Sequence, residues 1–179
     1  MRHNDPKRLL EIGAWLICAA SAVFAGSLLV VGGVSIDVLS LGAPLLLLAF
    51  LVGAYVFYRW WRPEPTISDI CGVFAVITLS GAAAGIISLA GLRLGAPLID
   101  GNLAAFDSAL RLDTRSMVIA AANTPIFAGL MGLAYLSSFP ILFASVVFLG
   151  WTRHVRPFWL LAFIFAFTAV GCATLSVFF

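Results

Sequence analysis

Residues 70–92 read ICGVFAVITLSGAAAGIISLAGL, and this stretch without a charged side chain decides the fold. An α-helix needs about 20 apolar residues, at a rise of about 1.5 Å each, to cross the roughly 30 Å hydrocarbon core of a bilayer. Residues 12–36, 38–58 and 157–179 form three further stretches of comparable length without Lys, Arg, Asp or Glu. The sequence therefore predicts several membrane-spanning helices.

The composition indicates the same class of protein. Hydrophobic residues make up 63% of the 179 residues and charged residues only 10%, whereas soluble proteins carry about 25% charged residues. The net charge of +2 is too small to indicate nucleic-acid binding. Cys18, Cys71 and Cys172 fall inside expected spans without C-x-x-C spacing, so we expect no disulfide, metal or cofactor.

A fifth charge-free stretch, residues 116–152, is too long for one ordinary span. Asn123-Thr124-Pro125 divides it, because the residue before a proline disfavours helical geometry. We expect an interfacial helix to about Asn123 and then a span in which Pro140 kinks the helix. The prediction is an all-α transmembrane helix bundle, a single domain over residues 1–179, with spans at 12–34, 38–58, 70–92, 125–151 and 157–179.

The orientation follows from the basic residues. The N-terminal tail, residues 59–62 and residues 153–156 carry Lys or Arg, whereas the turn at 35–37 carries none. Cytoplasmic loops are enriched in Lys and Arg, so five spans place the N-terminus in the cytoplasm and the C-terminus outside. The five tryptophans lie near the ends that these charges place in the cytoplasm, at Trp15, Trp60, Trp61, Trp151 and Trp159.

Prolines mark the turn between the second and third spans. Pro63 and Pro65 prevent the second helix from continuing. Thr66 and Ser68 are the candidate N-caps of the third helix, which we expect to begin near Ile70.

Two glycines inside the third span form a GxxxG motif. Gly81 and Gly85 would let another helix approach closely, since small residues allow backbones to pack tightly in a membrane. Both packing within the chain and pairing of two copies fit this motif.

The segment 93–124 is the only extended polar part, and the predicted topology places it outside. Asp100 is the candidate N-cap of a short helix in which Leu103, Phe106 and Leu110 share one face. We expect one or two short helices here to lie on the outer membrane surface.

A mildly polar patch precedes Pro140 in the fourth predicted span. It consists of Tyr135, Ser137 and Ser138. Its hydroxyls could satisfy the backbone groups that the proline leaves without partners, or they could face a substrate cavity.

Three parts of the second half of the chain together resemble a known family. They are Pro97-Leu98-Ile99-Asp100, the run LAAFDSALRLD at 103–113, and LAYLS at 133–137 followed by Pro140. This pattern resembles the N-terminal half of the bacterial type 2 phosphatidic acid phosphatase superfamily, in its inositolphosphotransferase-like branch. The resemblance implies a bacterial inner-membrane protein of a family that acts on lipid phosphates with two histidines, an aspartate and Lys/Arg residues, without a metal.

The catalytic residues of that family have no counterpart in this chain. The histidines are His3 and His154, and the predicted topology places both in the cytoplasm, away from an outer-face site. The segment SFPILFA at 138–144 echoes the family's S-F-P-S-x-H-A motif but has Ile141 and Phe143 in place of its serine and histidine. We therefore assign no catalytic residue.

Three functional hypotheses remain open from the sequence. The chain could be a shortened, inactive superfamily member, or one part of a split phosphatase or phosphotransferase whose partner chain supplies the histidines. A small-solute transporter is the weaker alternative, because the expected spans contain no ionisable group. The expected partners are membrane lipids and a partner chain or second copy, with no nucleic acid.

Overall fold

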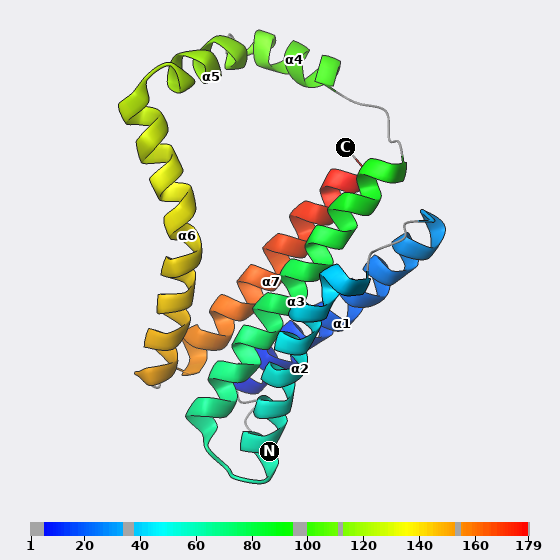
Figure 1. The fold of residues 1–179 in the computed structure, drawn as a ribbon, viewed down its shortest axis with the longest axis vertical. Coiled ribbons are helices and arrows are strands. Elements are labelled where there is room, and N and C mark those ends of the chain that lie inside the picture. Colours follow the sequence, from blue (N-terminus) through cyan, green and yellow to red (C-terminus); the bar gives the residue numbers. More distant parts are fainter. Residues whose placement is uncertain (1–5, 34–37, 95–99, 111–112, 153–154, 179) are drawn as a thin grey trace. The chain divides into compact units, whose positions relative to one another are not determined.

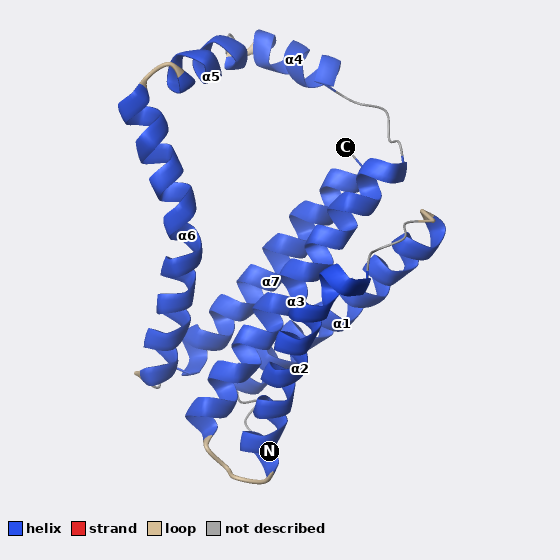
Figure 2. Ribbon diagram, viewed as in Figure 1, coloured by secondary structure: helices blue, strands red, loops and turns tan. Residues whose placement is uncertain are grey.

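The computed structural model describes residues 6–33, 38–94, 100–110, 113–152 and 155–178. These residues form helices and, among themselves, no strand (Figures 1 and 2). The helices are α1 (Pro6–Val31), α2 (Val38–Trp60), α3 (Pro65–Leu94), α4 (Asp100–Ala109), α5 (Thr114–Ala122), α6 (Pro125–Trp151) and α7 (Val155–Phe178). Five of them, α1, α2, α3, α6 and α7, are long and apolar enough to cross a membrane. The chain is therefore an all-α, polytopic integral membrane protein, as the sequence predicts.

The chain divides into two units. The first contains α1, α2, α3 and α7, together with α6 from Val146 onward. The second contains α4, α5 and the part of α6 up to Ser145. Each unit is described separately below.

Helix α3 is the central element of the first unit. It packs against α1, α2 and α7, and α1 also packs against α7. Although α1 and α2 are consecutive, they are not among the closely packed pairs in the described part of the chain. Helix α2 consequently contributes no buried residue from its apolar stretch, Gly42–Trp60.

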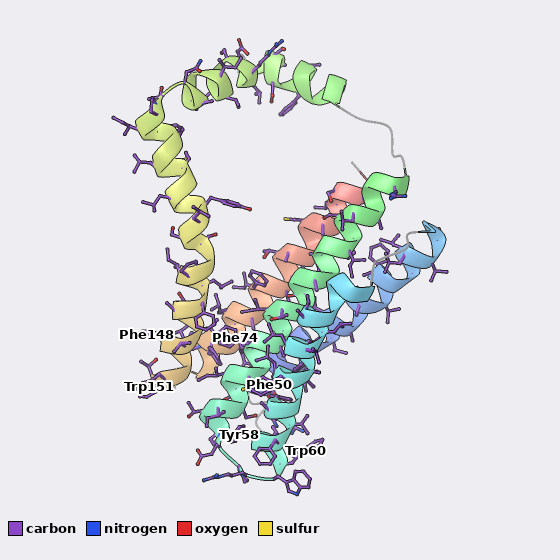
Figure 3. All side chains as sticks on the ribbon, in the orientation of Figure 1. Phe50, Tyr58, Trp60, Phe74, Phe148 and Trp151 are labelled. Carbon is purple, nitrogen blue, oxygen red and sulfur yellow. The ribbon has the colours of Figure 1, made fainter. Side chains whose placement is uncertain are left out.

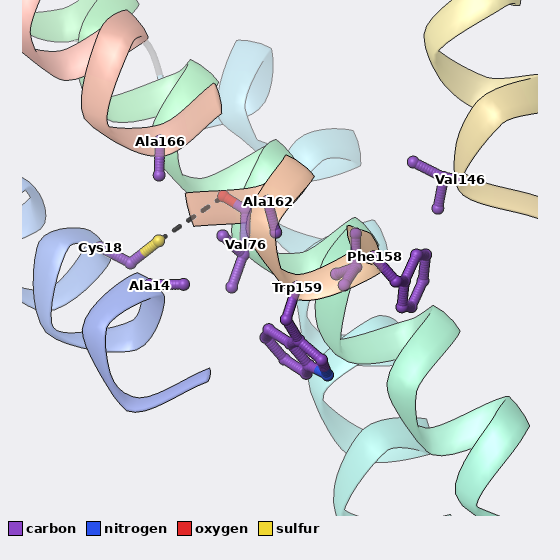
Figure 4. Packing of buried hydrophobic residues seen from close by; sticks show 9 residues of the cluster. Ala14, Cys18, Val76, Val146, Phe158, Trp159, Ala162 and Ala166 are labelled. Atoms are coloured by element: carbon purple, nitrogen blue, oxygen red, sulfur yellow. Dashed lines mark hydrogen bonds between the residues drawn. The ribbon is translucent and has the colours of Figure 1, made fainter. Parts of the chain in front are cut away.

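Small side chains form the seam between α1, α3 and α7. Ala14 and Cys18 of α1 meet Val76 of α3 and Ala162 and Ala166 of α7 in one buried cluster (Figure 4). The Cys18 thiol donates a hydrogen bond to the Val76 carbonyl oxygen at 3.5 Å. Such residues let helix backbones approach closely where lipid removes most of the hydrophobic driving force between helices. A second cluster continues the seam with Ala25, Ala83, Ile87, Ala173 and Val177.

Two helix ends differ from the sequence prediction. Helix α3 begins at Pro65, and a proline at the first helical position lacks only a donor that would be unpaired in any case. Ser68 therefore lies inside the helix, where its hydroxyl donates to the Tyr55 carbonyl oxygen at 3.3 Å instead of capping. Helix α1 begins at Pro6, not near residue 12. The charges of residues 7–11 and Asp69 thus belong to the long helices.

The second unit contains a well-defined helix start. The Asp113 carboxylate accepts a hydrogen bond from the Ser116 backbone N–H at 3.0 Å and caps α5. This hydrogen bond stabilises the charged carboxylate and lowers the pKa of Asp113 below its usual value. Helix α5 ends before Asn123 and α6 begins at Pro125, as the Asn123-Thr124-Pro125 signal predicts.

The glycines that lie against neighbouring helices are not those of the GxxxG motif. A Cβ atom at Gly72 would lie 2.8 Å from Tyr55 and 3.1 Å from Trp159. A Cβ atom at Gly81 or Gly85 would have no neighbouring heavy atom within 4 Å. The expectation of close packing within the chain at Gly81 and Gly85 is therefore not met among the described residues, because α3 uses a different face. Pairing of two copies through the motif stays a prediction.

Leucine substitutions at these glycines should show which face of α3 packs against the other helices. We expect Gly72→Leu to lower the free energy of unfolding by about 1–3 kcal/mol, because the new side chain overfills a packed interface. Gly85→Leu should change it by less than about 0.5 kcal/mol. Thermal unfolding in detergent, followed by tryptophan fluorescence, measures both, and equal losses would contradict the packing described here.

Candidate functional site

Two buried carboxylates lie at one end of the first unit, where the N-terminal turns of α1, α3 and α7 meet the C-terminal turns of α2. Glu11 and Asp69 are each only 5% exposed. Burial of a carboxylate is costly unless partners compensate the charge. The side chains around both residues supply such partners.

Glu11 joins α1 to α2. Its Oε1 lies 2.8 Å from Nη1 of Arg59 and accepts a hydrogen bond from the Tyr55 hydroxyl at 2.6 Å. Its Oε2 accepts from Nη2 of Arg59 at 3.4 Å. The Arg59 guanidinium also lies 5.6 Å from the centre of the Tyr55 ring, within the range of a cation–π interaction. Both Glu11 oxygens are therefore occupied by donors from α2.

Asp69 joins α3 to α1 and α7. Its Oδ2 lies 2.8 Å from the Lys7 ammonium nitrogen. Its Oδ1 accepts a buried hydrogen bond from the Trp159 indole nitrogen at 3.1 Å. The two carboxylates thus connect all four long helices of the unit at one end. Figure 3 shows Tyr58 and Trp60 at this end of α2, beside the connection to α3.

The space between α1 and α2 contains a cavity next to this charged end. The cavity measures about 550 Å³ and is lined by Arg8, Glu11, Trp15, Tyr55 and Arg59, with apolar residues of α1. It lies between two helices that do not pack closely on one another. We call it the charged cavity.

A second cavity follows further along the same two helices. It measures about 210 Å³, and α3 contributes to its wall. Gly26 and Leu29 of α1 and Pro44, Leu45 and Leu48 of α2 line it. Among the described residues that line it, only Thr78 has a polar side chain. We call this cavity the apolar recess, and the two cavities together the amphiphilic groove.

The helix spacing shows that one groove face carries both cavities. On α1, the lining residues run from Arg8 through Leu16 to Gly26 and Leu29 at helical spacing. The stretch from Leu16 to Gly26 rises about 15 Å, which is about half of the hydrocarbon core. The groove therefore runs from a charged end along a length of helix that corresponds to about half of the hydrocarbon core.

The predicted interfacial helix is only partly described. Asp100 is the first residue of α4, and Leu110 follows its end. Phe106 is 63% exposed and Leu110 is 55% exposed. The side chains of Asp100 and Leu103 lie outside what the structure describes, so their shared face stays a prediction.

The two serines of the polar patch before Pro140 form hydrogen bonds within their own helix. The hydroxyls of Ser137 and Ser138 donate to the carbonyl oxygens of Ala134 and Tyr135, at 3.0 and 2.6 Å. The carbonyl that loses its helical donor at Pro140 belongs to Leu136 instead. Tyr135 is 74% exposed.

Sequence reasoning missed the charged end of the bundle because it placed the span boundaries beyond it. Glu11 and Asp69 each stand directly before a charge-free stretch. The available signal was a single carboxylate next to an apolar stretch, with a tryptophan four residues after Glu11. The pairing partners come from other helices and cannot be identified from local spacing.

His3 and His154 lie outside the described residues, and within the described residues no group of three His, Cys, Asp or Glu residues is placed to hold a metal ion. Comparisons of the chain with protein-family models, with curated proteins and with solved structures found no match. The site is therefore interpreted from its own chemistry.

Removing one carboxylate should weaken the bundle. We expect Asp69→Asn to lower the free energy of unfolding by about 1–3 kcal/mol, because Lys7 loses a charged acceptor in a half-buried site. The matched control, Glu64→Gln, alters an exposed carboxylate of the α2–α3 connection and should change stability by less than about 0.5 kcal/mol. Thermal unfolding in detergent measures both variants. Equal stability of Asp69→Asn and the wild type would show that the ion pair contributes nothing.

Proposed function

We propose that this integral membrane protein binds a membrane lipid in the amphiphilic groove, without catalysing a reaction by itself. The observation that carries the proposal is the change of polarity along one pair of helix faces. The charged cavity is lined by Arg8, Glu11 and Arg59, and the apolar recess follows it on the same helices. A lipid has the same order of groups, with a polar head followed by an apolar chain.

The dimensions favour an acyl chain over a helix from another protein. An α-helix with its side chains is about 10–12 Å wide, which exceeds what a recess of about 210 Å³ can take. The recess lies between helices that are apolar enough to span a membrane, so lipid chains surround it. A chain from the neighbouring leaflet can enter the recess without crossing a polar barrier.

Lipid binding accounts for the charged residues better than transport does. Glu11 and Asp69 place ionisable groups inside α1 and α3, which a transporter requires. Both carboxylates, however, are held by protein donors at one end of the helices. Their contacts are those of a fixed structural cluster, and we therefore favour a stationary binding site.

The resemblance to the phosphatidic acid phosphatase superfamily fits this proposal as a working hypothesis. A non-catalytic bundle could pack beside a partner chain that supplies the histidines at the outer face, while the lipid in the groove has its headgroup on the opposite, cytoplasmic side and is a stationary component of the bundle. In this hypothesis the bundle lies in a bacterial inner membrane, with the basic residues and the charged cavity on the cytoplasmic side. Co-purification with a histidine-bearing membrane protein would support this part of the proposal.

Filling the apolar recess should displace the lipid. A Cβ atom at Gly26 has open space around it, so Gly26→Leu should fold normally while its side chain occupies the recess. Displacing two or three methylene groups, at about 0.8 kcal/mol each, predicts a roughly fifteenfold to fiftyfold loss of lipid affinity. Native mass spectrometry of the detergent-solubilised protein measures the bound lipid.

Gly53→Leu provides the matched control. Gly53 lies on α2 with open space around its Cβ position, and it lines neither cavity. We expect this variant to bind lipid like the wild type. Equal lipid binding by Gly26→Leu and Gly53→Leu would contradict a binding site in the groove.

A further inference from the structure

We infer that the lipid in the groove carries an anionic, phosphate-containing headgroup, which lies against Arg8 and Arg59 in the charged cavity. This inference rests on the proposed lipid binding and specifies the class of lipid. It follows from a count of hydrogen-bond donors and acceptors at the charged end of the groove.

The acceptors at this end are already occupied. Glu11 uses Oε1 for Arg59 and the Tyr55 hydroxyl, and Oε2 for the second guanidinium nitrogen of Arg59. Asp69 uses its two oxygens for Lys7 and Trp159. A headgroup with an ammonium group would need a carboxylate of its own. Among the described residues that line the cavity, every carboxylate already has protein partners.

The donors, in contrast, exceed the acceptors. A guanidinium has five N–H donors, and the contacts with Glu11 account for two of the Arg59 nitrogens. Arg8 is exposed and lines the same cavity. The Trp15 indole N–H is buried without a hydrogen-bond acceptor among the described residues, and this side chain also lines the cavity. The described part of the site therefore lacks hydrogen-bond acceptors that are still free, and the oxygens of a phosphate group would supply them.

The charges lead to the same class of ligand. A third cavity, of about 260 Å³, is also bordered by Arg59, and Lys7, Ser68 and Asp69 contribute to its lining. Across the two polar cavities, three cations (Lys7, Arg8 and Arg59) face two carboxylates (Glu11 and Asp69). Among the described residues that line these two cavities, one positive charge is in excess, and arginine matches the geometry of phosphate oxygens.

The test compares lipids that share their acyl chains and differ in the headgroup. The full chain in detergent is titrated with phosphatidylglycerol, phosphatidylcholine and diacylglycerol, and separately with inorganic phosphate. We expect phosphatidylglycerol to bind most tightly. Arg8→Gln should weaken its binding roughly tenfold, since hydrogen bonds to charged groups contribute about that factor. Binding of diacylglycerol should not change.

Arg62→Gln is the matched control for charge. Arg62 is exposed in the α2–α3 connection and lines neither polar cavity. This variant removes the same charge, so a general electrostatic effect on anionic lipids would weaken binding in both variants. We expect phosphatidylglycerol binding to fall in Arg8→Gln alone.

The outcomes separate this inference from the proposed function. If Gly26→Leu abolishes lipid binding but the three lipids bind equally, the groove stands and the headgroup inference is wrong. The inference is also wrong if Arg8→Gln weakens all three lipids equally, or if inorganic phosphate binds as tightly as phosphatidylglycerol. If Gly26→Leu binds every lipid like the wild type, the proposed function itself fails.

Discussion

The compensation of two buried carboxylates organises the first unit of this protein. Glu11 and Asp69 would each be costly in an apolar environment, and each is matched by a cation and a further donor from other helices. Helix α2 depends on this arrangement most, because its apolar stretch buries no residue. Polar contacts at one end supplement the packing of α2 on α3, whereas a seam of small side chains holds α1, α3 and α7 along their length.

The groove is a consequence of this unequal packing. The alanine-rich seam draws α1, α3 and α7 together, and α2 packs on α3 alone among the closely packed pairs. A space remains between α1 and α2, charged where Glu11 meets Arg59 and apolar beside Gly26 and Pro44. The interaction that fixes the position of α2 therefore also forms the polar end of the candidate binding site.

A feature of this structure could be predicted from the sequence where nearby residues determine it, and could not where distant residues do. The five long helices were predictable because a bilayer requires about 20 apolar residues in each, and Asn123-Thr124-Pro125 marks a local break. The packing face of α3 was not predictable, because a GxxxG motif identifies small residues but not their neighbours. Gly72 lies against Tyr55, whereas Gly81 and Gly85 have open space around them. The charged cluster also escaped prediction, since Asp69 is paired with residues distant in the sequence.

The long sequence separation between Asp69 and its partners has a consequence for biosynthesis. Lys7 and Trp159, the partners of Asp69, lie 62 and 90 residues away from it along the chain. A ribosome delivers α1 and α3 to the membrane long before α7 emerges. Asp69 can therefore meet Lys7 early, but its second partner arrives only with α7. The order of synthesis makes α7 the helix that completes the contacts of Asp69, and earlier intermediates hold a carboxylate whose set of contacts is unfinished.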